Sequence, residues 1–442
     1  MHKTFHIERL CYGADAIAHD ENGRTVFVAG GVPGDVVEVE LVEEKARFAR
    51  GVMVGEPIET SEFRIAPKCA ACGGCPWAHI SYEYQIQAKT ANVRDALIRT
   101  GHLDAERVDA ILHPCIPSPD VWGYRNKIEL NVQMGADGRL ALGMAEAASR
   151  KLSPIDACPL AVKAAADAPK ALRGALRYLA GTSDLGLFRV GVRASKRTKE
   201  LEVSLWTNPG SFPRAQAVKI LRQALPKATS IVRVIADEGK ARTVKTVEAL
   251  WGRGCWSEDL AGARFQTSAP SFFQVNTPQA EVLVKTALEF LGGEDALNGA
   301  YVADLYSGGG TFSIPLAKAG ADVVAVESAG SSVRDLRRNA HENGVEEAIE
   351  VIGGDTAREL PELGELDALI VDPPRAGLAD GVPESIAAAH PAKVVYVSCD
   401  PATLARDIAR LEKLDYQMAA IQPVDLFPQT FHVETVVLMT KK

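Results

Sequence analysis

The chain has 442 residues, more than one hydrophobic core usually serves, so we expect two or three domains. Hydrophobic residues make up 47% of the sequence, and the mean hydropathy is close to zero. The sequence has no apolar run of about 18 residues, which excludes a membrane-spanning helix. The first residues, MHKTFHIERLCYG, contain no apolar signal-peptide core, so we expect a cytoplasmic protein.

Charge is distributed unevenly along the chain. The net formal charge is −8, but residues 76–270 hold 28 Lys and Arg against 19 Asp and Glu, whereas residues 271–442 hold 13 against 26. A basic middle between acidic ends fits a nucleic-acid contact confined to one region. A solvated surface explains the same pattern equally well, so charge alone does not decide.

Residues 1–60 contain short apolar-alternating runs, such as residues 36–42, separated by Asn-Gly, Gly-Gly and Pro-Gly dipeptides. This pattern predicts a small β-barrel of the OB type. Barrels of this size often bind RNA, but the acidic composition of this one opposes contact with phosphates.

Three of the eight cysteines form a compact run, Cys69-x2-Cys72-x2-Cys75-Pro. Such clustering does not suit a secreted disulfide framework. The spacing is typical of ferredoxin-like ligands, and Cys158, also followed by Pro, is a suitable fourth thiolate for an iron–sulfur cluster. Zinc is the alternative, although zinc sites more often use two separated CxxC pairs.

Residues 61–270 mix helix and strand patterns, which indicates an α+β domain. Residues 82–100 predict a helix closed by Gly101, and we expect the stretch 82–112 to pack on the C-terminal domain. We expect strands at residues 127–134, 188–194, 201–207 and 231–236, with helices near residues 161–180 and 213–224. Because this domain carries the basic surplus, we expect it to contact RNA.

From residue 271 onward, strand and helix patterns alternate. The expected strands are residues 301–306, 322–327, 349–352, 366–372, 393–398 and 433–440, and helices fit between them, for example residues 331–342 and 402–413. The early strands are short apolar runs, as strands buried on both faces require. The pattern predicts an α/β fold with a doubly wound, Rossmann-like parallel sheet.

The segment DLYSGGGTF joins the first of these strands to a helix through three glycines, which let the backbone pass close to a ligand. Glu327 ends the next strand, 23 residues after Asp304, and is placed to bind ribose hydroxyls. The spacing differs from GxGxxG, and no Lys follows the glycines as in ATP sites. S-adenosylmethionine, which has no phosphate, fits better, with Tyr306 and Phe312 as an apolar wall. Asp355 either reads the adenine amino group or caps a helix.

Three residues near the ends of later strands carry candidate chemistry. Asp372 and Cys399 follow the fourth and fifth strands, whose carboxyl ends face the ligand crevice of a parallel sheet. Cys399 precedes a helix start, where the helix dipole favours a thiolate. Methyl transfer to an unreactive carbon such as C5 of uracil requires a thiol that adds to C6 and a base that removes the C5 proton. Glu434, at the start of the last strand, is the candidate base.

The motifs DLYSGGGTF, DPPRAG, SCDPATLARD and FPQTFHVETV, in this order, resemble the RNA uracil-5-methyltransferase family. The resemblance implies a class I methyltransferase domain over residues 271–442, with Cys399 as nucleophile and Glu434 as base. It further implies S-adenosylmethionine contacts at Gln274, Tyr306, Thr311, Glu327, Asp355 and Asp372. In residues 1–60, VAGGVPGDVVEVELVEE resembles a TRAM domain, and GYRNKIE resembles a central-domain motif of the family.

The resemblance also bears on the metal and the substrate. Iron–sulfur members of the family bind a 4Fe-4S cluster through cysteines equivalent to Cys69, Cys72, Cys75 and Cys158, with a longer gap before CGGC than in this chain. A TRAM domain together with such a cluster resembles the ribosomal-RNA branch. We therefore expect a monomeric enzyme that flips a 23S rRNA uridine into a pocket between the central and catalytic domains, with tRNA as the alternative substrate.

Two other functions remain open at this point. DPP motifs also serve methyltransferases that act on amino groups of nucleic acids, although those motifs usually continue with an aromatic residue and Arg375 follows here. A non-catalytic RNA-binding protein with a redox-sensing cluster is the other alternative.

Overall fold

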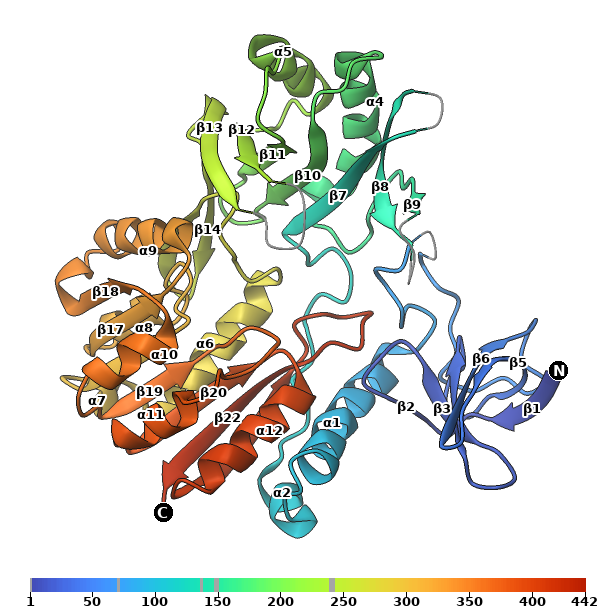
Figure 1. Cartoon of the computed structure of the whole chain (residues 1–442), viewed down its shortest axis with the longest axis vertical. Coiled ribbons are helices and arrows are strands. Elements are labelled where there is room, and N and C mark those ends of the chain that lie inside the picture. The colour runs from blue at the N-terminus through green and yellow to red at the C-terminus, as the bar shows by residue number, and fades with distance from the viewer. Residues whose placement is uncertain (1, 70–71, 136–137, 147–150, 238–242) are drawn as a thin grey trace.

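The computed structural model describes residues 2–69, 72–135, 138–146, 151–237 and 243–442. These residues form three lobes: a small β-sheet lobe at the N-terminus, a central α+β lobe and a C-terminal α/β lobe (Figure 1). Within these ranges, no helix has both the length and the apolar character needed to cross a membrane.

The N-terminal lobe is the expected barrel. Its strands are β1 (His2–His6), β2 (Arg9–Leu10), β3 (Ala16–His19), β4 (Thr25–Ala29), β5 (Val36–Glu44) and β6 (Phe48–Met53), and they pair in the order β1-β5-β6-β4-β3-β2. The two edge strands of this order, β1 and β2, follow each other directly within residues 2–10. The sheet therefore curves back so that its two edges meet. The inward side chains alternate along the strands and form a buried core that includes Phe5, Ile7, Val26, Val28, Val37 and Val39.

The central lobe is built on a seven-stranded sheet. Its strands are β7 (Lys127–Met134), β8 (Leu140–Ala145), β9 (Leu152–Ser153), β10 (Leu187–Ala194), β11 (Leu201–Thr207), β12 (Ser230–Ala236) and β13 (Val244–Gly252), in the order β13-β12-β11-β10-β7-β8-β9. Helices α3 (Lys163–Ala166), α4 (Ala168–Ala180) and α5 (Arg214–Ala224) share its apolar core. The four strands expected from the sequence are present, whereas β8, β9 and β13 were not anticipated.

The C-terminal lobe contains the doubly wound sheet, in the order β18-β17-β16-β19-β20-β22-β21. Strands β16 (Tyr301–Leu305), β17 (Asp322–Glu327), β18 (Ile349–Gly353), β19 (Ala368–Val371) and β20 (Lys393–Ser398) are parallel. Strands β21 (Tyr416–Val424) and β22 (Glu434–Lys441) are antiparallel to their neighbours. The antiparallel edge and the whole of β21 were not predicted.

Helices cover both faces of this sheet. One face packs against α6 (Thr277–Leu291), α7 (Gly293–Leu297), α8 (Ser313–Lys318) and α9 (Gly330–Glu342), together with the hairpin of β14 (Trp256–Leu260) and β15 (Ala263–Thr267). The other face packs against α1 (Tyr82–Arg99), α2 (Ala105–Ile111), α11 (Val382–Ala388) and α12 (Pro401–Glu412). Short helical turns are α10 (Thr356–Glu359) and the 3-10 turns Glu346–Ala348 and Leu360–Glu362.

Two segments that precede residue 271 therefore belong to the C-terminal core. Val93 and Leu97 of α1 and Val108 of α2 are buried in the same cluster as residues of α12 and β21, and α1 lies beside α12 (Figure 1). Trp256 and Phe265 of the β14–β15 hairpin are buried on the opposite face.

A buried ion pair joins α1 to the loop between β21 and β22, residues 425–433, called here the β21–β22 loop. Lys89 Nζ lies 2.5 Å from Asp425 Oδ1, and both side chains are fully buried. The Tyr82 hydroxyl donates a hydrogen bond to Asp425 Oδ2 (2.7 Å), and Lys89 also donates to the Phe427 carbonyl oxygen (3.0 Å). A buried charge with this many partners is stabilised only in one geometry, so the pair fixes the start of the loop.

We predict that Lys89→Ala lowers the free energy of unfolding by about 3–5 kcal/mol, because it leaves the Asp425 carboxylate buried without its cation. Urea unfolding followed by circular dichroism measures the change. Arg94→Ala is the matched control on the same helix, since it breaks an ion pair with Asp109 whose side chains are 41% and 48% exposed, and should cost less than about 1 kcal/mol. Equal losses in the two variants would contradict the prediction.

Candidate active site

The strand order reverses at β16, which opens a crevice at the carboxyl edge of the C-terminal sheet. From β16 the chain continues to β17 and β18 on one side, while β19 and β20 lie on the other. Leu305 at the end of β16 pairs with Val371 at the end of β19, so the residues that follow them, Tyr306 and Asp372, lie next to each other. Ligands of doubly wound sheets bind at such a switch point.

The glycine-rich loop after β16 makes a sharp turn at this edge. Tyr306 adopts a φ of 62°, and Gly310 a φ of 93°. A Cβ atom on Gly310 would lie 2.4 Å from Leu336 Cδ1, so only glycine fits there. Glu327 holds the loop from the end of β17: its two carboxylate oxygens accept hydrogen bonds from the Gly308 amide (2.9 Å) and the Ala329 amide (2.6 Å).

Two acids lie beneath this loop in a poorly solvated position. Asp304 is buried and accepts a hydrogen bond from the Ser313 hydroxyl. Burial raises the pKa of Asp304 to about 7. Loss of water contact, and then the charge of Asp304, raises the pKa of Asp372 to about 7. A bound cation or hydrogen-bond donor would be favoured here, because either relieves the repulsion between the two carboxylates.

Two of the other predicted cofactor residues, Asp355 and Thr311, follow strands at the same edge of the sheet, and the third, Gln274, precedes α6. Asp355 follows β18, is exposed, and caps α10 by accepting a hydrogen bond from the Ala357 amide through Oδ1 (3.0 Å), which shows the capping role and does not decide the contact with adenine. Thr311 is half-buried in the turn that leads into α8. Gln274 is buried just before α6, and its carbonyl oxygen accepts a hydrogen bond from Asn126 Nδ2 (2.8 Å).

Cys399 and Glu434 are brought together by the antiparallel edge of the sheet. Ser398 at the end of β20 pairs with Thr435 near the start of β22, so Cys399 and Glu434 lie at the same edge on neighbouring strands. Asp372 is close to both, since its charge raises the pKa of each. The structure thus groups the three residues that carried the chemistry in the sequence analysis.

Burial and like charge raise the pKa of Glu434 to about 8. The side chain is 4% exposed, and desolvation has the largest effect, followed by the charge of Asp372, while Arg375 opposes both. A carboxyl group with such a pKa exchanges a proton readily near neutral pH.

The expectation that a helix N-terminus favours the Cys399 thiolate is wrong. Burial, then the charges of Glu434 and Asp372, raise the pKa of Cys399 to about 12. The first turn of α12 is occupied by Asp400, whose carboxylate accepts hydrogen bonds from the Ala402 and Thr403 amides (3.0 and 3.1 Å). The helix end is therefore neutralised by a carboxylate instead of stabilising the thiolate.

Arg375 and His432 form the polar rim of this group. Arg375 Nη2 lies 3.1 Å from His432 Nε2. Burial, and then the charge of Arg375, lower the pKa of His432 to about 4, so the imidazole is uncharged near neutral pH. The contact of Arg375 with His432 is not predictable from local sequence patterns, because the two residues are 57 positions apart in the chain.

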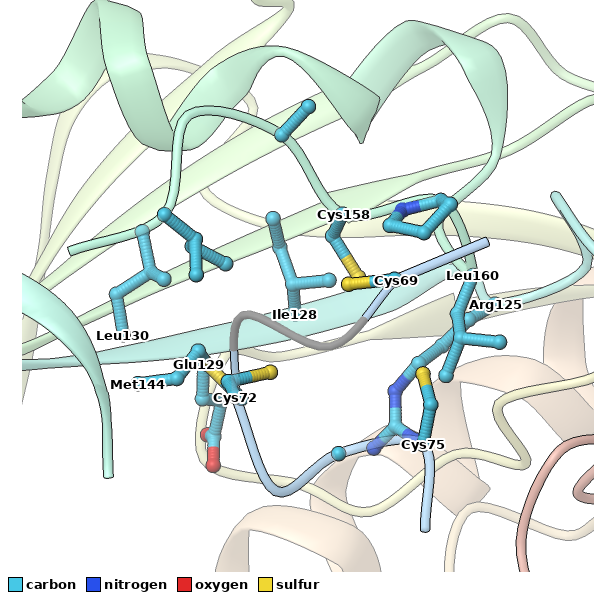
Figure 2. Close-up of a pocket in the computed structure, with 14 residues that line it drawn as sticks. Cys69, Cys72, Cys75, Arg125, Ile128, Glu129, Leu130, Met144, Cys158 and Leu160 are labelled. Carbon is cyan, nitrogen blue, oxygen red and sulfur yellow. The ribbon is translucent and has the colours of Figure 1, made fainter. Parts of the chain in front are cut away.

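The four cysteines singled out in the sequence line one cavity in the central lobe. Cys69, Cys72, Cys75 and Cys158 surround a space of about 140 Å³ next to β7 (Figure 2). Burial, then the neighbouring thiols, raise the pKa of Cys75 to about 12. Among the described residues, no group of three or more Cys, His, Asp or Glu is placed to hold a single metal ion.

Three features define this lobe as a class I methyltransferase that uses S-adenosylmethionine: the strand order, the glycine-rich loop and the acid at the end of β17. The chain belongs to the RNA uracil-5-methyltransferase family: the family described as tRNA (Uracil-5-)-methyltransferase matches residues 215–442, and the TRAM domain matches residues 5–54. The predicted fold and enzyme class are confirmed, and the amino-group and non-catalytic alternatives are set aside.

Relatives match over the whole length. An uncharacterized RNA methyltransferase of Gloeobacter violaceus is 37% identical, with 99% of this chain and 96% of that protein covered. Another, of Thermotoga maritima, is 32% identical, with 100% and 99% covered. The crystal structure of Pyrococcus abyssi tRNA (uracil-54, C5)-methyltransferase in complex with S-adenosyl-L-homocysteine is 27% identical and matches with a TM-score of 0.75 over 100% of both chains.

We predict that iodoacetamide alkylates Cys399 about tenfold faster for each unit of pH between about pH 7 and about pH 10, because a thiol far below its pKa ionises in that proportion. Mass spectrometry of the peptide that contains Cys399 measures the rate. Glu434→Gln removes the nearest carboxylate charge and should lower the pKa of the thiol, so alkylation at about pH 9 should be faster. A rate that levels off near neutral pH would contradict the raised pKa.

Proposed function

We propose that Cys399 and Glu434 carry out methyl transfer to C5 of a uracil in RNA. The Cys399 thiol gives up its proton to solvent, and its sulfur adds to C6. The C5=C6 electrons then form the new bond from C5 to the methyl group, while the bond from that methyl group to the cofactor sulfur breaks and leaves its electron pair on the sulfur. Glu434 then takes the C5 proton, the C5=C6 bond re-forms, and the sulfur leaves C6. The observation that carries this proposal is the β20–β22 pairing, which places a buried carboxyl group of raised pKa next to the cysteine.

We assign six residues of the crevice to S-adenosylmethionine, which when bound supplies the methyl group on a positively charged sulfur. They are Gln274, Tyr306, Thr311, Glu327, Asp355 and Asp372. Glu327 accepts the ribose hydroxyls from its position at the end of β17, as acids at this place in doubly wound sheets do. Asp372 lies near Cys399 and Glu434, so its carboxylate would favour the positive charge of the cofactor sulfur beside them.

The RNA that we propose is 23S rRNA, since a TRAM domain accompanies the cysteine run in this chain. tRNA is the second candidate, and the full-length similarity to the Pyrococcus abyssi tRNA enzyme favours it. Incubation of the protein with labelled S-adenosylmethionine and separate rRNA and tRNA pools, followed by nucleoside mass spectrometry, distinguishes them. 5-Methyluridine in rRNA alone supports the first, and in tRNA alone the second. Its absence from both would overturn the proposed function.

We predict that Glu434→Gln accumulates a covalent adduct between the protein and RNA that already carries the methyl group. Without the carboxylate the C5 proton stays, so the sulfur–C6 bond cannot be eliminated. A band that resists denaturation and contains label from both S-adenosylmethionine and RNA is the expected result on a gel. Cys399→Ala in the same background must abolish the band. If Glu434→Gln turns over like the wild type, another group is the base.

We further propose that Cys69, Cys72, Cys75 and Cys158 hold a 4Fe-4S cluster. The four cysteines line one shared cavity, and their run Cys69-x2-Cys72-x2-Cys75 followed by proline is typical of ferredoxin-like ligands. Zinc sites more often use two separated CxxC pairs.

Protein purified without oxygen is therefore expected to contain about four iron and four sulfide per chain and to show the visible absorption of thiolate-ligated iron. Cys158→Ser should reduce the iron content. Cys255→Ser, at a buried cysteine outside this cavity, is the control and should leave the iron content unchanged. A colourless protein with one zinc per chain would be incompatible with the cluster.

A further inference from the structure

Tyr12 reaches from the N-terminal barrel to the catalytic edge of the C-terminal sheet. It lies in the loop between β2 and β3, residues 11–15, and its hydroxyl donates a hydrogen bond of 2.9 Å to the carbonyl oxygen of Cys399. That carbonyl belongs to the turn from β20 into α12, which sets the direction of the Cys399 side chain. A residue of the first domain is thus in direct contact with the backbone of the cysteine.

The same ring also contacts the segment that leads into Glu434. Tyr12 packs edge-on against Phe431, with ring centroids 5.5 Å apart and an interplanar angle of 85°, and lies 6.3 Å from the ring of His432. Phe431 and His432 precede Glu434 by three and two residues. Tyr12 therefore touches both chain segments, and their separation depends on where its ring lies.

The position of Tyr12 is itself fixed by buried hydrogen bonds. Trp77, which is fully buried, donates from its indole nitrogen to the Gly13 carbonyl oxygen (3.1 Å). The backbone amide of Trp77 donates to the Gln429 carbonyl oxygen (3.1 Å) in the β21–β22 loop. Trp77 thus ties the barrel loop that carries Tyr12 to the β21–β22 loop.

Burial raises the pKa of Tyr12, so its hydroxyl keeps its proton throughout the working range of the enzyme and remains a donor. No charge change is available at this position near neutral pH. The Tyr12 hydroxyl therefore acts through the position of its hydrogen bond and not through a change of charge.

We propose that Tyr12 is a positioning residue for methyl transfer, through which the barrel holds the Cys399 turn in register with Glu434. The inference rests on the proposed roles of those two residues. It assigns the N-terminal barrel a part in the chemical step, in addition to any contact that its surface makes with RNA.

Tyr12→Phe removes the hydroxyl and keeps the ring, so it isolates the hydrogen bond to Cys399. We expect kcat to fall about fivefold to tenfold, the size expected for one hydrogen bond that matters in the transition state, with KM for RNA and for S-adenosylmethionine unchanged. In the Glu434→Gln background the covalent adduct should form more slowly by the same factor. The melting temperature should stay that of the wild type.

Tyr84→Phe is the matched control, because Tyr84 lies where the barrel meets α1 and packs on Phe63, away from the catalytic edge. It should behave as the wild type. An unchanged kcat in Tyr12→Phe, or an equal fall in Tyr84→Phe, would overturn the inference. A rise in KM for RNA with constant kcat would make Tyr12 an RNA contact instead.

Hydrogen–deuterium exchange without RNA separates this inference from the proposed function. The peptide that spans residues 394–404 should exchange faster in Tyr12→Phe than in the wild type, and not in Tyr84→Phe, because the turn loses its anchor. This result does not depend on which reaction the enzyme catalyses. Equal exchange in all three proteins refutes the positioning role, whereas absence of methylation by the wild type refutes only the proposed function.

Discussion

Strand β22 runs back along β20, and this antiparallel pairing is the constraint on which the catalytic edge depends. In a fully parallel sheet the residue that begins a strand lies at the amino edge, far from the cofactor crevice. Because β22 is reversed, its first residue, Glu434, lies at the carboxyl edge beside Cys399. A shift in this register would move the carboxyl group away from the cysteine while leaving both residues intact.

The β21–β22 loop is where all three lobes meet. Lys89 forms its ion pair with Asp425, the first residue of the loop. Gln429 is held by hydrogen bonds with Trp77 and Gln85. The Tyr124 hydroxyl donates to the Pro428 carbonyl oxygen (3.1 Å). Gln429 has a φ of 68°, an unfavourable conformation for a residue with a side chain, which persists because these contacts over-determine it. The conformation of the loop therefore depends on contacts from all three lobes.

Local patterns predicted much of this architecture. Strand β17 and strand β20 have the expected bounds, and the glycine loop and Glu327 lie where the alternation of strand and helix put them. Strand β21 was missed, although Tyr416, Met418 and Ile421 are buried along it with partial alternation. The contacts of Tyr12 with Cys399 and of Lys89 with Asp425 join residues more than 300 positions apart, and no periodicity within one segment reveals them. The pKa of Cys399 was misjudged because its burial and the charges of Glu434 and Asp372, which come from other parts of the chain, are not visible in the local sequence.

The raised pKa of Cys399 also affects how readily its thiol is oxidised. Peroxides attack the thiolate and not the thiol, so a cysteine that stays protonated at rest is a poor target for sulfenic acid formation. Burial of Cys399 and its acidic neighbours, which together raise this pKa, thus also make the thiol less prone to oxidation.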